Sequence, residues 1–386
     1  MKPGNCRASL FELPQFGQCR HWADRWYKSA MWLLVDGQRG CFFLLAERIP
    51  FGYIPVIFLI ASYLGMETDK KSNLTAEYEK DGLFRILCLD GGGAKGFYTL
   101  GVLKEIEGML GCPLHKRFDL VFGTSTGAII AALIALGYEV DAIHELYKKH
   151  VPSVMRAGSA QCKSAALAKL ADEVFGKKTF EDVLTGVGIV STKWLIERPM
   201  IFKGDVAQAH GRIGTFTPGF GVSIADAVQA SCSAFPFFER KTVTTSKGDD
   251  VELIDGGYCA NNPTLYAIAD ATEAMNRERE NLRVVSIGVG VYPEPSPRSL
   301  KMWFAKKYLL SVQLLQKTLE INTQSMDQLR AILFKDIKTI RISDTFEKPE
   351  MATDLMEHDL VKLNILRQRG SESFASREMD LKAFLL

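Results

Sequence analysis

Short apolar runs alternate with longer amphipathic stretches along most of the chain. The runs Phe84–Leu89, Gly188–Leu195 and Arg283–Val289 are typical of buried strands, whereas Gly96–Leu110 and Ser164–Phe175 carry apolar residues near helical spacing. Strands that alternate with helices predict an α/β fold with a parallel-rich sheet and helices on both faces. From about residue 295 the chain is expected to be mostly helical.

The first 66 residues do not share this pattern. Residues 49–66 form an uncharged run that is just long enough for a membrane span, although Pro50 and Pro55 interrupt it. Three interpretations compete: a signal anchor, an extra packing element, and upstream sequence before a true start at Met66. We expect the third, with 67–83 as a polar leader and 84–386 as the functional domain.

Composition narrows the class of protein. Of 386 residues, 47% are hydrophobic and 24% are charged, as in an ordinary globular protein, and the net charge of +2 gives no argument for DNA or RNA as a partner. The eight cysteines are scattered, without the paired spacing of a zinc site, so no metal is expected. Unpaired thiols in apolar runs favour a reducing cytoplasm.

The stretch 118–136 reads FDLVFGTSTGAIIAALIAL and has the form of a nucleophile elbow. An apolar run ends at Gly123, and a small-residue helix is expected from Ala128 to about Leu136. The turn between them consists of Gly123, Thr124, Ser125, Thr126 and Gly127. Such a turn presents a serine hydroxyl, and the helix N-terminus stabilises developing negative charge. A plain strand-turn-helix connection is the alternative interpretation.

A glycine loop follows the first predicted strand and has two possible meanings. Its six residues are Gly91, Gly92, Gly93, Ala94, Lys95 and Gly96. The G-x-G-x-x-G spacing suits a dinucleotide-binding protein, but Asp90 would repel a pyrophosphate, and Asp119 begins a strand where the expected acid ends one. Alternatively, the backbone N–H groups form an oxyanion hole, with the Lys95 charge nearby.

A serine nucleophile needs a group that takes its proton. Only His210 and His358 lie well downstream of Ser125, and both are expected at the surface. Asp255 is the better candidate, because it ends the predicted strand Val251–Ile254 and precedes Gly256 and Gly257. There the carboxylate can be held against a hydroxyl from a neighbouring strand.

Taken together, DGGGAKG, GTSTG and DGG in this order resemble the patatin-like phospholipases. Further similarity lies in LDGGGAKGFYTLGVL, AVQASCSAFPFFE, IDGGYCANNP and RVVSIGVG, so the resemblance covers about 84–290. It implies a Ser–Asp dyad, with Ser125 as nucleophile, Asp255 as proton acceptor and the glycine loop as oxyanion hole. Lys95 stands where the family often has arginine, which leaves the anchoring of the loop open.

The general run of sequence is also similar to bacterial patatin-like effectors that cyclic GMP-AMP activates in anti-phage defence. This implies cyclic GMP-AMP as an allosteric activator, no other cofactor, membrane phospholipid as substrate and a possible homo-oligomer. The expected place of action is the cytoplasmic surface of the inner membrane. A constitutive lipid esterase without nucleotide control is the alternative.

Two other classes of protein stay open at this point. One is a dinucleotide-binding protein that uses the glycine loop, and the other is a non-catalytic protein anchored by residues 49–66. We also expect Leu300–Lys317 to contact the membrane, because aromatic and aliphatic residues there alternate with lysines. A helix that packs on the domain core is the other interpretation of that segment.

Overall fold

The computed structural model describes residues 33–34, 42–43, 82–293 and 306–386. The chain divides into two compact units, Met1–Glu77 and Tyr78–Leu386. In the first unit, β1 (Leu33–Leu34) pairs antiparallel with β2 (Phe42–Phe43). The run 49–66, the start at Met66 and residues 300–305 of the segment Leu300–Lys317 fall outside the described residues. Those hypotheses therefore stay predictions.

The second unit is built on one mixed sheet, whose described strands follow the order β10-β9-β3-β4-β5-β8-β7, with β6 paired to β5. Parallel pairing joins β3 (Phe84–Leu89), β4 (Leu120–Thr124), β5 (Gly186–Lys193), β9 (Leu282–Ile287) and β10 (Lys338–Ile342). Antiparallel pairing adds β6 (Arg198–Lys203), β7 (Lys241–Thr244) and β8 (Asp250–Asp255). The parallel-rich sheet is confirmed. The sequence analysis missed β7 and β10, and β10 lies in the part expected to be helical.

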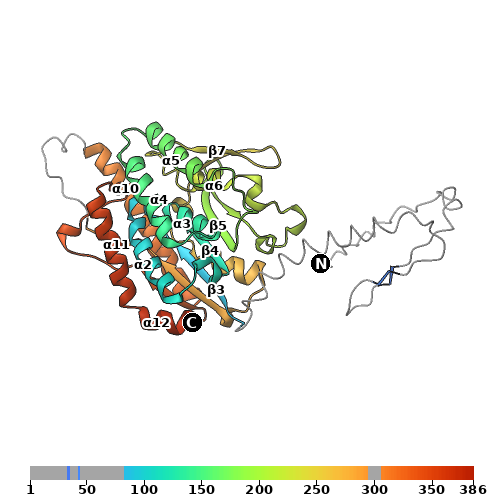
Figure 1. Cartoon of the computed structure of the whole chain (residues 1–386). Helices are drawn as coiled ribbons and strands as arrows, with labels where there is room; N and C mark the ends of the chain where they lie inside the picture. The colour runs from blue at the N-terminus through green and yellow to red at the C-terminus, as the bar shows by residue number, and fades with distance from the viewer. Residues whose placement is uncertain (1–32, 35–41, 44–81, 294–305) are drawn as a thin grey trace, which may run out of the picture. The chain divides into compact units, whose positions relative to one another are not determined.

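Helices pack on this sheet as Figure 1 shows. They are α2 (Gly96–Leu110), α3 (Thr126–Ala135), α4 (Val140–Arg156), α5 (Ala160–Phe175), α6 (Ile224–Ser231), α7 (Gly257–Ala260), α8 (Thr264–Ala269), α10 (Lys306–Leu333), α11 (Leu360–Ala375) and α12 (Glu378–Leu385). Helix α11 lies alongside α2 (Figure 1). Their backbones approach closely at Gly101 and Gly370, where an added Cβ would lie 2.0 Å from Arg367 O and 2.1 Å from Tyr98 O. No side chain fits at either contact.

The two faces of the sheet bury separate hydrophobic cores, because successive strand residues point to opposite sides. On β3, Leu87 and Leu89 join the larger core under α2 to α6, whereas Ile86 and Cys88 join the smaller core, which includes α8 residues such as Ile268. All four strand residues are fully buried. The prediction of helices on both faces is therefore confirmed.

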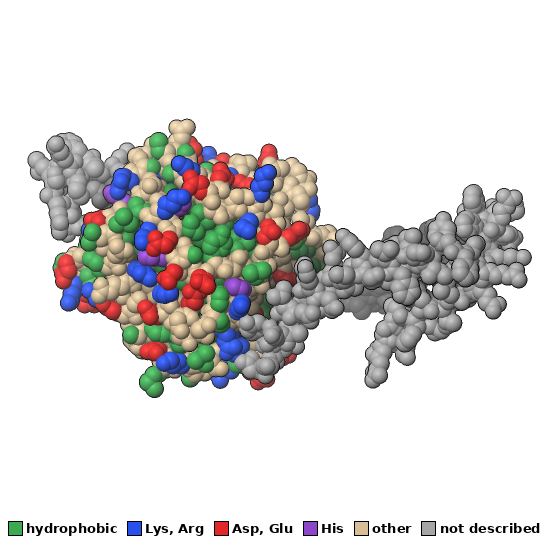
Figure 2. All heavy atoms as spheres, viewed as in Figure 1, with side chains coloured by type: hydrophobic (Ala, Val, Ile, Leu, Met, Phe, Trp, Pro, Cys, Tyr) green, Lys and Arg blue, Asp and Glu red, His purple; other side chains and the backbone are tan. Residues whose placement is uncertain are grey.

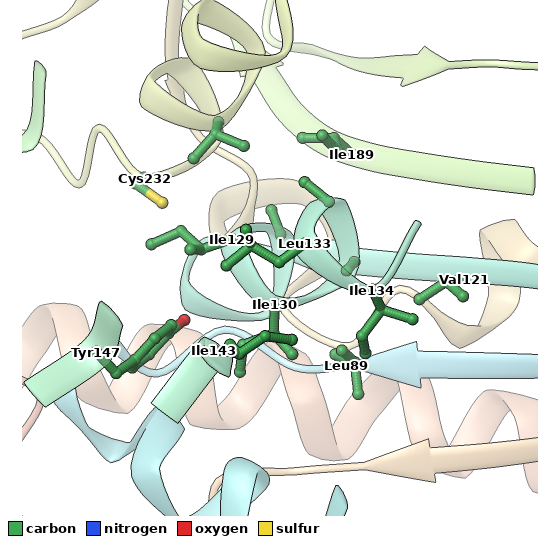
Figure 3. Close-up of a cluster of buried hydrophobic side chains, with 14 of the residues drawn as sticks. Leu89, Val121, Ile129, Ile130, Leu133, Ile134, Ile143, Tyr147, Ile189 and Cys232 are labelled. Carbon is green, nitrogen blue, oxygen red and sulfur yellow. The ribbon is translucent and has the colours of Figure 1, made fainter. Parts of the chain in front are cut away.

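Helix α3 lies inside the larger core rather than at its edge. Its sequence TGAIIAALIA is apolar all round, which is typical of a buried helix. In Figure 3 it is surrounded by Ile189 of β5, Val121 of β4, Leu89 of β3, and Ile143 and Tyr147 of α4. This packing holds the turn before α3 rigidly in place.

Acidic and basic side chains are interspersed on the face of the molecule that Figure 2 shows, with hydrophobic side chains between them. That face carries no large patch of one charge, in line with the small net charge. Among the described residues, no helix has the length and apolar character required to cross a membrane.

Candidate active site

The elbow turn places Ser125 at the junction of β4 and α3. Its backbone has φ 53° and ψ −121°, a strained conformation for a residue with a side chain. Gly123 and Gly127 permit the turn, since an added Cβ would lie 2.2 Å from Gly127 O and 2.3 Å from Leu89 O, respectively. The close packing around the turn therefore holds the Ser125 backbone in this conformation, from which the hydroxyl projects.

Asp255 ends β8 and lies at the same level of the sheet as Ser125. Strand β5 stands between β4 and β8, so the two residues are not on neighbouring strands as the sequence analysis expected. Thr124 pairs with Val190, and Asp255 pairs with Ser191. The two side chains meet across β5, where the Ser125 hydroxyl donates a hydrogen bond of 2.6 Å to Asp255 Oδ2.

Hydroxyl groups fix the backbone on both sides of this pair. Ser231 Oγ accepts a hydrogen bond from Ser125 N at 2.9 Å and donates one to Val190 O at 2.5 Å. Thr192 Oγ1 donates to Asp255 O at 3.0 Å, and the other carboxylate oxygen, Asp255 Oδ1, accepts from Gly257 N at 2.7 Å. Neither Ser231 nor Thr192 was singled out from the sequence: Ser231 lies in the quoted stretch AVQASCSAFPFFE without a predicted role, and Thr192 belongs to no recognisable motif.

The Asp255 carboxyl is 2% exposed. Burial raises its pKa from the model-compound value of 3.8 to about 6, although the Ser125 hydroxyl and the Gly257 N–H both favour the charged form. A carboxylate with a pKa closer to neutrality is a stronger base than one in water. Asp255 can thus accept the serine proton near pH 7 without help from an imidazole.

The glycine loop lies beside Ser125, and most of its backbone N–H groups are already bonded. Gly91 N donates to Asn261 O, Ala94 N to Leu355 O and Lys95 N to Gly92 O, and the Gly96 N–H closes the short helical turn Gly93–Lys95. Within the described part of the chain, the N–H groups of Gly92 and Gly93 have no acceptor. These two residues line the pocket that holds Ser125 and Asp255, so they are the donors available to a developing oxyanion.

Side chains remote in sequence anchor the glycine loop. Arg341 of β10 binds both carboxylate oxygens of Asp90, with Nη1–Oδ1 at 2.9 Å, and also donates to Ser286 Oγ at 2.8 Å. Asn261, after the aspartate turn, donates from Nδ2 to Gly91 O at 3.2 Å. The Lys95 side chain does not line the catalytic pocket but reaches Glu320 of α10, with Nζ–Oε1 at 3.4 Å.

An apolar pocket of about 630 Å³ opens onto Ser125 and Asp255. Its walls come from α3, α4, α5, the segment after α6, α10 and the loop before α11; they include Ile129, Val154, Leu167, Leu170, Phe238, Leu315 and Leu355. A hydrocarbon chain would be buried here against aliphatic side chains, with its carbonyl end near the serine.

The histidines lie elsewhere. His210 Nε2 contacts Asp270 Oδ1 at 2.7 Å, and His358 Nδ1 contacts Met356 O at 3.3 Å. In the described ranges, Ser125 Oγ pairs with the Asp255 carboxylate, and no histidine bonds to it. Nor do those residues bring together three or more His, Cys, Asp or Glu side chains in a metal-binding arrangement.

Comparison with known proteins places this fold and site in a family. Residues 87–268 match the model described as patatin-like phospholipase. A protein of Escherichia coli, named a cUMP-AMP-activated phospholipase, is 73% identical over 315 residues, which cover 82% of this chain and 98% of the relative. The chain therefore belongs to the patatin-like phospholipases, a class of lipid acyl hydrolases. That membership removes support from a dinucleotide-binding protein built on the glycine loop.

One more distant relative in sequence agrees with this assignment. A cGAMP-activated phospholipase of Vibrio cholerae is 27% identical over 247 residues, covering 56% of this chain and 67% of the relative. Among solved structures, VipD from Legionella pneumophila matches with a TM-score of 0.42 and 14% identity, covering 78% of this chain and 67% of the other.

Proposed function

We propose that this protein is a phospholipase of the A type that a cyclic dinucleotide activates, with Ser125 as nucleophile and Asp255 as the single base. The observation that carries the catalytic part is the 2.6 Å hydrogen bond between Ser125 Oγ and a buried Asp255 carboxylate at the end of an apolar pocket. The substrate class is membrane phospholipid, because the pocket suits a fatty-acyl chain whose ester carbonyl would sit at the serine.

The reaction follows from the positions of these groups. Asp255 takes the Ser125 proton as Oγ attacks the ester carbonyl, and the N–H groups of Gly92 and Gly93 hold the oxyanion. Protonated Asp255 then gives its proton to the departing lysolipid oxygen, which leaves an acyl-enzyme. Water, deprotonated by the same carboxylate, attacks the acyl carbonyl. Protonated Asp255 then returns its proton to Ser125 Oγ as the acyl bond breaks, which releases the fatty acid and restores the dyad. No step requires a metal.

The relatives support the regulatory part of the proposal. The relative that is 73% identical is named for activation by cUMP-AMP, and more distant ones for activation by cGAMP. Cyclic GMP-AMP was the activator expected from the sequence, but the greater identity makes cUMP-AMP the first candidate. We also propose that the protein acts at the cytoplasmic surface of the inner membrane, in anti-phage defence.

The test is fatty-acid release from phospholipid vesicles by the purified full chain, with no nucleotide, with cUMP-AMP and with cGAMP. The matched control is Ser125→Ala under each condition. We expect release that depends on Ser125 and rises with one of the two nucleotides. Equal Ser125-dependent release in all three conditions would favour the constitutive esterase. Release by Ser125→Ala at the parent rate would overturn the assigned nucleophile.

A further inference from the structure

A second cleft, open to solvent, adjoins the glycine loop but includes neither Ser125 nor Asp255 in its lining. It shares Gly92, Leu319 and Leu355 with the catalytic pocket. Its lining includes more polar side chains than that of the catalytic pocket, among them Asp90, Lys95, Gln316, Glu320, Gln324 and Ser343. The mechanism proposed above uses none of these side chains, so the cleft needs its own explanation.

The buried charges of Asp90 and Lys95 in this cleft differ in how closely their ion-pair partners approach them. Asp90 is neutralised by Arg341, which binds both of its oxygens. The Lys95 side chain is 3% exposed, and in the described part of the chain its ammonium meets one carboxylate oxygen, Glu320 Oε1, at 3.4 Å. Charge-assisted bonds of this type are normally about 2.7–2.9 Å long. Burial lowers the pKa of Lys95 while Glu320 opposes that shift, so closer anionic contact would stabilise this cation.

Glu320 can give up its contact with Lys95 without becoming a buried, unpaired charge. Its Oε1 also accepts a hydrogen bond of 2.8 Å from Gln316 Nε2, one turn earlier on α10. Its Oε2 lies 4.0 Å from Lys317 Nζ, and the Glu320 side chain is 25% exposed. An incoming anion could therefore replace Glu320 at Lys95, while Glu320 keeps partners on its own helix and contact with water.

We propose that this cleft is the activator site, in which Lys95 binds a phosphodiester group of the cyclic dinucleotide in place of Glu320. The proposal rests on the nucleotide activation proposed above. A phosphodiester carries one negative charge and offers acceptor oxygens to the Lys95 ammonium. Gln324 and Ser343 supply further hydrogen-bonding groups in the lining of the same cleft.

The glycine loop lines both cavities, which explains how a ligand in the cleft alters the N–H groups beside Ser125. Lys95 belongs to the loop, and Ala94 N donates to Leu355 O, a residue common to both cavities. Gly92 separates the cavities and packs against Val289 so closely that an added Cβ would lie 2.6 Å from Cγ2. Because Lys95 N donates to Gly92 O at 3.2 Å, moving Lys95 shifts the Gly92 and Gly93 N–H groups that face the oxyanion. A ligand that binds better to the active loop position then raises the activity.

The experiment introduces opposite charges at one exposed position of the cleft. Calorimetry measures binding of cUMP-AMP and cGAMP to the full chain and to its variants Gln324→Glu and Gln324→Lys. We expect Gln324→Glu to raise the dissociation constant about tenfold. Gln324→Lys should leave the dissociation constant unchanged or lower it. Glu320→Gln, which removes the competing carboxylate, should tighten binding severalfold.

The outcomes separate this proposal from the activation on which it rests. Nucleotide-stimulated hydrolysis with an affinity that all three variants leave unchanged would overturn the cleft and leave activation standing. Hydrolysis without any nucleotide binding would overturn both. Glycerophosphocholine serves as a second probe of phosphodiester chemistry. If it alone binds in a charge-dependent way, the occupant is a lipid headgroup and the assignment to a cyclic dinucleotide is wrong.

Discussion

The glycine loop separates two cavities of opposite character. On one side, aliphatic side chains form a pocket that ends at Ser125 and a single buried carboxylate. On the other side, Asp90, Arg341, Lys95 and Glu320 form two ion pairs around a polar cleft. The apolar side suits an acyl chain and the polar side suits a charged ligand, yet one stretch of backbone forms a wall of both. Chemistry and the proposed control can therefore be linked through Gly92, which lines both cavities.

The largest expected effect tests the apolar side. Ser125→Ala and Asp255→Ala should each lower ester hydrolysis by at least about 10³-fold, because each removes one half of a single proton-transfer unit. The double variant should be no worse than either single one. Steady-state rates on a soluble ester measure this, with His210→Ala and His358→Ala as controls that should stay near the parent rate. Near-normal turnover by Asp255→Ala, together with loss in a histidine variant, would replace the dyad with a triad.

The next effect tests the ion pair behind the loop. Arg341→Met leaves the Asp90 carboxylate, 1% exposed, without its cation. The free energy of unfolding should fall by about 3 kcal/mol, as expected when one partner of a buried pair is removed. Chemical denaturation measures the loss, and the double variant Asp90→Asn/Arg341→Met should recover part of it. A single variant as stable as the parent would mean that β10 does not anchor the loop through this contact.

The pH dependence of turnover tests Asp255 as the base on the apolar side. Asp255 must be ionised to accept the Ser125 proton, and burial raises its pKa to about 6. Turnover of an uncharged ester should therefore be level at higher pH and fall about tenfold per unit once the pH drops below that value. A rate profile from pH 8 to pH 4.5 checks this. A constant rate down to pH 5 would show that the essential base is a more acidic group.

The smallest effect concerns the shape of the apolar pocket. Leu170→Phe adds volume to a wall of the pocket, so hydrolysis of long-chain esters should fall about threefold to tenfold, while a butyrate ester is unaffected. Comparison of kcat/KM along a series of acyl lengths measures the change. Leu329→Phe, at a position 41% exposed on α10, provides a matched control. Equal losses for short and long esters would place the acyl chain elsewhere.

Local sequence determined the elements that carry the chemistry. The strand Phe84–Leu89 and the helix Gly96–Leu110 have the bounds predicted from hydrophobic pattern alone. The turns at Ser125 and Asp255 could likewise be recognised, because backbone packs so closely at both that glycine is required at fixed positions. These features depend on residues only a few positions apart. Backbone geometry strongly restricts the conformations that such close neighbours can adopt together.

Tertiary structure alone decided how these elements meet. Asp255 reaches Ser125 across an intervening strand, because β8 pairs antiparallel with β5 and sets the two residues level. Arg341 reaches Asp90 from 251 residues away, on a strand that the sequence analysis had placed in a helical region. The side chain of Lys95 faces Glu320 rather than the serine. Pairing register and long-range ion pairs come from packing the whole chain, so no local pattern specifies them.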